Sequence, residues 1–340
     1  MILILENIIF FCILLITNFL VIKNYKYLGK KINIYDVPNE KRKIHKNPVP
    51  LIGGIIIYFN IFFLLIYVSF KKNDHLLNIF IHSEPKGLIY ALLSFTGIFL
   101  IGLYDDKYKI RPSVRLLFLS ILIYILLKTD QTLLIHSINF SFPGYDINFK
   151  LGVFIFTFLC FLTLLISCNL NDGINLQSAI FFLINFIILY FITQNFLILL
   201  IIFSLIIFSL LNFNGKIFLG DSGVYLLSIL LGFYFIKYYN YGYSLKADQV
   251  FLFLFFPVLD SARCFAYRLI KGKNILLADN LHFHHILLKK INYSKTIIII
   301  TIFYLIPLGG YLFKISTAHV LILILVGYFL VLFKVRSQKK

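Results

Sequence analysis

Long apolar segments follow one another along almost the whole chain, and they constrain the fold more than any other feature of the sequence. The chain opens with "MILILENIIFFCILLITNFLVI", and comparable runs of Ile, Leu and Phe recur to its end. About 20 mostly apolar residues form a helix that crosses the hydrocarbon core of a bilayer. Hydrophobic residues make up 60% of the 340 residues and charged residues only 14%, against about a quarter charged in soluble domains. The sequence therefore predicts an all-α, polytopic membrane protein with a single domain, residues 1–340.

Eleven such segments can be placed, which predicts about 10–11 membrane spans. Only the polar stretch "TQN" at 193–195 separates the sixth segment from the seventh. The first segment lacks the basic n-region and cleavage site of a secretory signal, so we expect an uncleaved helix with its N-terminus outside. The expected helices cover residues 2–22, 51–70, 87–104, 114–128, 151–168, 178–193, 195–212, 218–237, 248–270, 295–314 and 317–335.

Lysine and arginine are distributed unevenly over this topology. With the N-terminus outside, 24 of the 32 Lys and Arg residues lie in the inner loops and flanks. The positive-inside rule predicts such a bias, which supports the orientation. The formal net charge of +18 therefore needs no nucleic acid as a partner, and the inner basic loops favour anionic lipids or an anionic substrate.

Five polar clusters fall on the predicted cytoplasmic face, whereas the outer loops offer little that is comparable. Scattered polar loops would not be so distinctive on one side and so bland on the other. A single site assembled from several cytoplasmic loops explains this pattern most simply. The clusters cover residues 36–54, 102–116, 168–177, 217–226 and 257–285.

Acidic and amide side chains in these clusters share one predicted membrane depth. Taken singly, each acid has a structural explanation: Asp105 and Asp106 end an apolar helix, and the sequences around Asp172 and Asp221 resemble turns. Together with Asn169, however, they supply the carboxylate and amide oxygens that suit Mg²⁺, which usually binds one or two carboxylates plus substrate phosphate oxygens. The set predicts a site for a hard cation.

Basic side chains lie on the same face. The positive-inside rule explains most of the lysines, but it does not explain why histidines join both basic groups. Such donors match a diphosphate, so acids and bases together predict phosphoryl transfer at the membrane interface. The basic residues are Arg42, Lys43 and His45 before the second helix, and Arg263, Arg268, Lys271 and Lys273 before the histidine cluster.

The stretch "LADNLHFHHILLKK" at 277–290 contains His282, His284 and His285. Zinc binding, phosphate or nucleotide binding and an inert basic loop are all compatible with this spacing. Zinc needs three or four convergent ligands, and no cysteine lies nearby in the sequence. The preceding cations repel a metal and attract an anion. We therefore favour phosphate or nucleotide binding over zinc.

Four motifs stand in a fixed order between residues 105 and 285. They are Asp105-Asp106 followed by Pro112, Asn169-x-x-Asp172-Gly173, Phe218-x-Gly220-Asp221-x-Gly223 and Asp279-x-x-His282-x-His284-His285. In this order they resemble the motifs of the polyprenyl-phosphate N-acetylhexosamine-1-phosphate transferases, glycosyltransferase family 4, a superfamily that includes the phospho-MurNAc-pentapeptide translocase. With the first cluster included, the resemblance spans about residues 36–285.

The resemblance implies transfer of a sugar 1-phosphate from a UDP-sugar to a polyprenyl phosphate such as undecaprenyl phosphate, with UMP released. It implies Mg²⁺ as the cofactor, with Mn²⁺ as a substitute, and Asp221 and Asn169 as metal ligands. It implies Asp105, Asp106 and Asp172 as catalytic residues. We expect the diphosphate or nucleotide at Arg42, Lys43, His45, Asn175, Arg268, His282, His284 and His285.

The chain departs from the family pattern at several positions. Asn175 replaces an acid linked to nucleotide recognition, Arg115 replaces a usual Lys, and Leu119 replaces a usual Gln. The reaction type is expected to stay the same, while the choice of sugar is left open. The His-x-His-His form resembles the enzymes that start O-antigen, teichoic-acid or capsule-type glycans, which favours N-acetylhexosamine 1-phosphate. Transfer of MurNAc-pentapeptide phosphate to the same lipid is the alternative.

Two other classes of protein fit the sequence less well. A transporter would carry ionisable residues or broken helices near the bilayer midplane, whereas the notable charges here lie at inner helix ends. A non-catalytic scaffold would leave the acidic clusters unexplained. We expect a multi-pass protein of the bacterial inner (plasma) membrane whose active site faces the cytoplasm, and a homodimer by family analogy alone.

Overall fold

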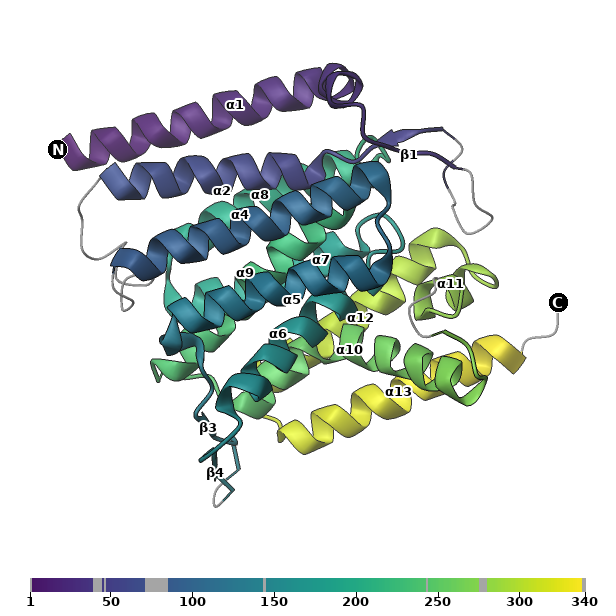
Figure 1. Ribbon diagram of the computed structural model, residues 1–340. Coiled ribbons are helices and arrows are strands. Elements are labelled where there is room, and N and C mark those ends of the chain that lie inside the picture. Colours follow the sequence, from purple (N-terminus) through teal and green to yellow (C-terminus); the bar gives the residue numbers. More distant parts are fainter. Residues whose placement is uncertain are drawn as a thin grey trace.

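The computed structural model describes residues 2–38, 45, 47–70, 85–142, 145–242, 244–274 and 280–337, and it has a helix at each of the eleven expected positions (Figure 1). The helices are α1 (Ile2–Ile32), α2 (Gly53–Phe70), α4 (Pro85–Tyr108), α5 (Pro112–Thr129), α6 (Val153–Leu170), α7 (Gln177–Thr193), α8 (Phe196–Phe213), α9 (Gly220–Asn240), α10 (Ala247–Ile270), α12 (Tyr293–Leu312) and α13 (Thr317–Ser337). The prediction of an all-α bundle is confirmed.

Eight of the described helices are long and apolar enough to cross a membrane: α4 from Ile89, α5, α6, α8, α9, α10, α12 and α13. The break expected at residues 193–195 is confirmed, because α7 ends at Thr193 and Gln194 takes a left-handed conformation (φ 53°) before α8. The first helix runs ten residues further than predicted. It changes direction at Asn24 (φ −107°, ψ 15°), whose side chain donates a hydrogen bond to the carbonyl of Leu20 (2.9 Å).

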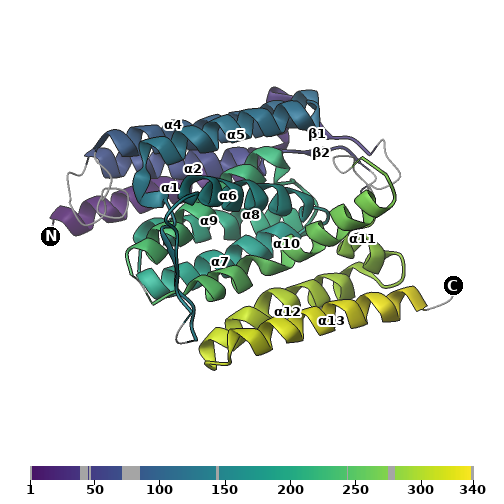
Figure 2. The same ribbon diagram turned by 60° about the horizontal axis from the view of Figure 1, so that its bottom comes forward.

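Helix α9 occupies the centre of the bundle. It packs against α2, α4, α6 and α7, and nearly all of its residues are buried. Figure 2 shows α1, α2, α4 and α5 on one side of α9, and α12 and α13 on the other. Because most of α9 is enclosed, its buried polar groups must find partners inside the protein.

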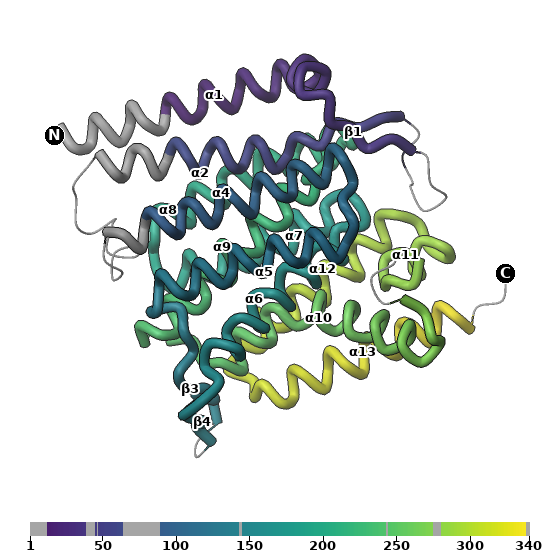
Figure 3. The backbone as a smooth tube through the Cα atoms, viewed as in Figure 1, coloured from purple at the N-terminus to yellow at the C-terminus, as the bar shows by residue number. Residues whose placement is uncertain are grey.

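The chain termini lie at opposite ends of the bundle (Figure 3). Near the C-terminal end lies a hairpin of β1 (Tyr35–Asp36) and β2 (Val49–Pro50). Its second strand continues into backbone hydrogen bonds with the segment before α9: Phe218 N donates to Pro50 O, and Gly53 N donates to Phe218 O, both at 3.0 Å. A second hairpin, β3 (Ser137–Ile138) with β4 (Ile147–Asn148), lies at the opposite end. The first hairpin is thereby fixed beside the N-terminus of α9.

A buried ion pair lies near the C-terminus of α9. Lys237 Nζ is 2.6 Å from Asp130 Oδ2, and both side chains are only 1% exposed. The Lys237 ammonium also donates to the Thr132 hydroxyl. A buried pair of this kind adds little stability by itself, but removal of one partner leaves an uncompensated charge.

We therefore expect Asp130→Ala to destabilise the protein by about 3–5 kcal/mol, seen as a lower Tm in detergent micelles. The double variant Asp130→Leu/Lys237→Met should recover most of the loss, because no charge is left buried. The exposed Asp146 provides a control, since Asp146→Asn should change stability by less than about 0.5 kcal/mol. An unchanged Tm in Asp130→Ala would contradict the prediction.

Candidate active site

The carboxylate of Asp221, in the first turn of α9, joins three other helices. Asn169 Nδ2, at the end of α6, donates to Asp221 Oδ1 at 2.7 Å, and Arg115 Nη1, in the first turns of α5, donates to Asp221 Oδ2 at 2.9 Å. The same Arg115 nitrogen also donates to Asp105 Oδ2 in α4. One guanidinium thus holds two acids side by side, which compensates part of their mutual repulsion.

Asp106 lies beside Asp105 but has different partners. Its carboxylate accepts hydrogen bonds from the backbone N–H groups of Asp221 (2.7 Å) and Ser222 (3.1 Å), which are free donors at the N-terminus of α9. It also accepts a hydrogen bond from Ser222 Oγ (2.8 Å). Gly220 precedes them with φ 74°, and a Cβ at that position would lie 2.5 Å from Asp106 Oδ2. Asp106 therefore caps α9 and fixes the direction in which Asp221 enters the cluster.

A short turn after α6 links this acidic cluster to the histidines. Asp172 N donates to Asn169 O at 3.2 Å, so the Asn-x-x-Asp sequence closes on itself. Gly173 follows, and a Cβ there would lie only 1.9 Å from His284 Nε2. Any other residue would displace the imidazole. The motif thus serves two functions in the fold: its asparagine reaches Asp221, and its glycine makes room for His284.

The three histidines lie in and just before the short helix α11 (Phe283–Leu288), which the sequence did not predict. The rings of His282 and His284 stack in parallel with 5.9 Å between centroids, and the ring of His285 is 4.2 Å from that of His284. His284 is 1% exposed, yet neither of its ring nitrogens has a hydrogen-bond partner among the described residues. Burial, together with His285 and His282, holds the pKa of His284 well below its usual range.

Unpaired buried nitrogens of this kind are rare in folded proteins and call for an explanation. A neutral imidazole offers one donor and one acceptor. His282 repeats the pattern, because its Nε2 is also buried without a partner in the described part of the chain. The histidine segment therefore contains buried nitrogens that lack a hydrogen-bond partner in the described chain. A bound polar ligand would supply the missing partners.

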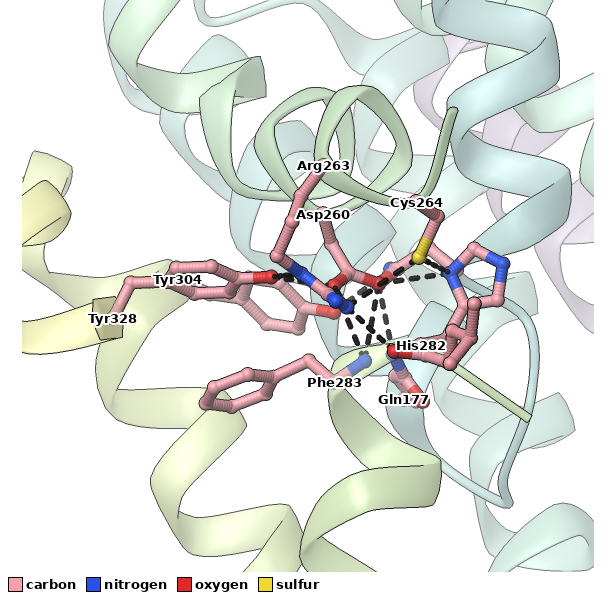
Figure 4. A network of polar contacts seen from close by, with 10 residues as sticks. Gln177, Asp260, Arg263, Cys264, His282, Phe283, Tyr304 and Tyr328 are labelled. Atoms are coloured by element: carbon pink, nitrogen blue, oxygen red, sulfur yellow. Dashed lines mark hydrogen bonds and ion pairs between the residues drawn. The ribbon is translucent and has the colours of Figure 1, made fainter. Parts of the chain in front are cut away.

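A second polar network surrounds Asp260 in α10 (Figure 4). His282 Nδ1 lies 2.9 Å from Asp260 Oδ2, and the backbone N of Phe283 donates to both carboxylate oxygens. On the other side, Arg263 Nη2 (2.7 Å) and the hydroxyl of Tyr328 (2.6 Å) donate to Asp260 Oδ1. The carboxylate thus connects α10, the histidine segment and α13.

The expectation that no cysteine accompanies the histidines is wrong in three dimensions. Cys264, one turn after Asp260 in α10, brings its Sγ to 3.6 Å from His282 Nδ1, and these three residues have ligand atoms within 4.8 Å of one another. A transition metal fits this group poorly, however. Arg263 Nη2 lies 3.4 Å from the sulfur and bonds to the carboxylate, so a cation would meet a positive charge and an acid already supplied with donors.

The remaining predicted residues that the structure describes make contacts of their own. His45 Nε2 is 3.2 Å from the carbonyl of Asp36, and its ring packs edge-on against Phe218, next to the start of α9. The carbonyl of Asn175 accepts a hydrogen bond from Tyr293 (2.8 Å). Arg268 is buried with its guanidinium over the ring of Phe265. Arg42, Lys43 and Asp279 lie outside the described residues.

Three contributing residues do not stand out in the sequence. Arg115 is visible only as a replacement for a usual Lys, although its place after an Asp-Asp pair is a usable signal. Asp260 belongs to the "PVLD" stretch of a predicted polar cluster, but it lies within an apolar helix and so does not stand out as a site residue. Tyr328 gives no signal at all, since an aromatic residue in an apolar span is ordinary.

Comparison with known proteins agrees with this geometry. Residues 88–239, which contain Asp105, Asp106, Arg115, Asn169 and Asp221, match the sequence profile of glycosyl transferase family 4. The resemblance inferred from the motifs is thereby confirmed.

Similar proteins are undecaprenyl-phosphate alpha-N-acetylglucosaminyl 1-phosphate transferases from several bacteria. The one from Thermotoga maritima is 26% identical over 290 residues, which cover 85% of this chain and 84% of that protein. The one from Escherichia coli K12 is 23% identical over 279 residues, 77% of this chain and 71% of the relative. The one from Salmonella typhi is 23% identical over 296 residues, 81% and 76%. The similarity thus extends well beyond the part matched by the profile.

Asp172 provides a test of the site in the absence of ligands. Burial, with a contribution from the charge of Asp36, raises the pKa of Asp172 from 3.8 to about 6. An acid of this kind stabilises the fold below the pKa of the unfolded chain, and that stability is lost as the pH rises through about 6. Asp172→Asn carries no charge, so its Tm relative to the wild type should rise between about pH 4 and pH 7. Asp146→Asn should track the wild type; a constant difference for Asp172→Asn would contradict the prediction.

Proposed function

We propose that the protein transfers N-acetylhexosamine 1-phosphate from a UDP-sugar to undecaprenyl phosphate. An oxygen of the acceptor phosphate attacks the sugar-bearing phosphorus of the donor. The bond from that phosphorus to the bridging oxygen breaks, and UMP leaves with the electron pair. The observation that carries the proposal is the turn from Asn169 to Gly173, which joins an acidic cluster at Asp221 to unpaired buried nitrogens at His284.

The acidic cluster suits a hard cation. The carboxylates of Asp105 and Asp221 share the Arg115 guanidinium, Asp106 binds the backbone of Asp221, and Asn169 adds an amide. Oxygen donors of this kind are those that Mg²⁺ or Mn²⁺ prefers. Asp221 and Asn169 are the residues that would hold the ion. When bound, a divalent cation neutralises charge on a diphosphate and on the departing phosphate.

The protein's own groups then divide the remaining work. Asp106 fixes the start of α9, and Arg115 keeps Asp105 beside Asp221, so the carboxylates are positioned before a substrate arrives. A phosphate monoester with a second pKa of about 6 is largely dianionic at neutral pH. Proton removal by Asp105 or Asp172 is therefore less demanding than correct placement of the two phosphates, which preorganised charges supply.

The histidine segment would contact the diphosphate or the nucleotide of the donor. His282 and His284 provide buried nitrogens without partners in the described chain, and His285 and Asn175 lie on neighbouring segments. The basic residues of the first cluster, Arg42, Lys43 and His45, are proposed to complete the anion-binding surface. His45 supports this, because it packs on Phe218 directly before α9.

The site is proposed to face the cytoplasm of a bacterial inner membrane. The first hairpin, the start of α9 and α11 lie toward the end of the bundle where α13 ends, and the charge bias favours a cytoplasmic position for that end. A transporter is disfavoured because the acids gather at the ends of α4 and α6 and at the start of α9 rather than at mid-helix. A homodimer remains a prediction by family analogy.

We expect membranes containing the protein to release UMP from UDP-N-acetylglucosamine only when undecaprenyl phosphate is added. UDP-N-acetylgalactosamine and UDP-MurNAc-pentapeptide, tested in parallel, identify the sugar. The measurement is UMP formed per unit of protein, with membranes lacking the protein as the blank. Absence of lipid-dependent UMP release from every donor would refute the proposed function.

We expect Asp221→Asn to lower Mg²⁺-dependent turnover by at least about 100-fold, because an anionic oxygen ligand is lost. The fold should persist, since the amide can still bond with Arg115 or Asn169. A matched control is Asp248→Asn, at the far end of α10, where the carboxylate accepts hydrogen bonds from Ser141 and Thr317. Near-normal turnover in Asp221→Asn would remove Asp221 from the metal site.

A further inference from the structure

Asp260 is linked to the site through a histidine rather than through a substrate. Its Oδ2 lies 2.9 Å from His282 Nδ1, and both side chains are only 6% exposed. An imidazole that donates from Nδ1 to a carboxylate has its tautomer fixed, and its Nε2 is directed away from that carboxylate. In this protein Nε2 of His282 is the buried nitrogen without a described partner.

We propose that Asp260 is a positioning residue, which holds His282 so that Nε2, the acceptor nitrogen of that tautomer, meets a hydroxyl or N–H group of the nucleotide of the donor substrate. The inference deepens the proposed function and rests on it. Asp260 itself does not touch the substrate, because donors from three directions already surround its carboxylate: His282, the backbone of Phe283, and the pair Arg263 and Tyr328. A group so fully engaged acts by orienting its neighbour.

The opposite side of the carboxylate explains why Asp260 is itself fixed. Arg263 Nη2 donates to Asp260 Oδ1 and also to the carbonyl of Leu281 (2.6 Å), directly before His282. The Tyr328 hydroxyl accepts from Arg263 Nε (2.5 Å) and donates to the same Oδ1. The arginine thus ties both the acid and the backbone of the histidine segment, and α13 closes the network (Figure 4).

The stacking of the rings extends this effect to His284. The parallel rings of His282 and His284 are 5.9 Å apart, and His284 lies directly against Gly173. A rotation of His282 would open the space against which His284 packs. Asp260 therefore fixes the orientation of His282. Through the His282 ring it also supports His284, which covers the Asn169–Gly173 turn.

The test is a double-mutant cycle on lipid-dependent UMP release. Asp260→Asn should lower kcat/KM for the UDP-sugar about 10–100-fold, as is typical when the partner of a functional histidine is changed. His282→Gln should cost at least as much, and the double variant should be no worse than His282→Gln alone, because Asp260 acts through that ring. Asp248→Asn, the same change in the same helix, should leave kcat/KM unchanged.

A spectroscopic arm does not depend on turnover. In protein labelled with ¹⁵N-histidine, the ring signals that vanish in His282→Gln belong to His282. Asp260→Asn should move these signals, as expected for an altered tautomer or hydrogen bond at Nδ1. Asp248→Asn should not move them.

The outcomes separate the two hypotheses. Independent, multiplying losses in the double variant, or unchanged His282 signals in Asp260→Asn, would overturn the positioning inference while the enzyme remains active. A wild-type protein without lipid-dependent UMP release would overturn the proposed function instead. If Asp260→Asn does not fold, Tyr328→Phe replaces it in the cycle, since it loosens the same carboxylate and should likewise add nothing to His282→Gln.

Discussion

The N-terminus of α9 is the point on which the rest of the site depends. The most enclosed helix of the bundle begins there, and its free backbone donors carry partial positive charge. Asp106 accepts those donors, Asp221 stands within the first turn, and Arg115 and Asn169 supply the remaining partners. Acids could not gather at the end of a buried helix without such compensation. The contacts that fix the start of α9 are therefore also those that bring together the acids of the proposed cation site.

Much of this arrangement follows from the sequence because its physical signals are local. Apolar length predicts each of the eleven long helices, and the polar clusters at helix ends predict where the acids meet. The role of Asp106 as a cap is less visible, since Asp105 and Asp106 look equivalent until the direction of α9 is known. Sequence spacing likewise cannot show that Gly173 lies under His284, because that contact joins segments more than a hundred residues apart.

The histidine cluster shows where reasoning along the chain fails. Distance in the sequence suggested that no cysteine accompanies these residues, yet α10 brings Cys264 and Asp260 to His282. The preference against zinc stays a prediction, and the reason for it is only partly visible in the sequence. Arg263 lies among the candidate ligands rather than merely near them in the chain. The packing of α10 against the histidine segment brings together the possible metal ligands and also Arg263, whose positive charge disfavours a metal there.

Tyr328 gives the C-terminal helix α13 a buried polar contact that its apolar sequence does not indicate. Helix α13 lies outside the segment that matches the family profile, residues 88–239. The Tyr328 hydroxyl nevertheless forms hydrogen bonds with Asp260 and Arg263 in the interior. Exchange of this helix between related proteins would therefore not be a neutral swap of membrane anchors. A hybrid that kept Asp260 and Arg263 but received an aliphatic residue at position 328 would lose a buried donor on which the carboxylate relies. Recombination between relatives should therefore keep Asp260, Arg263 and Tyr328 together.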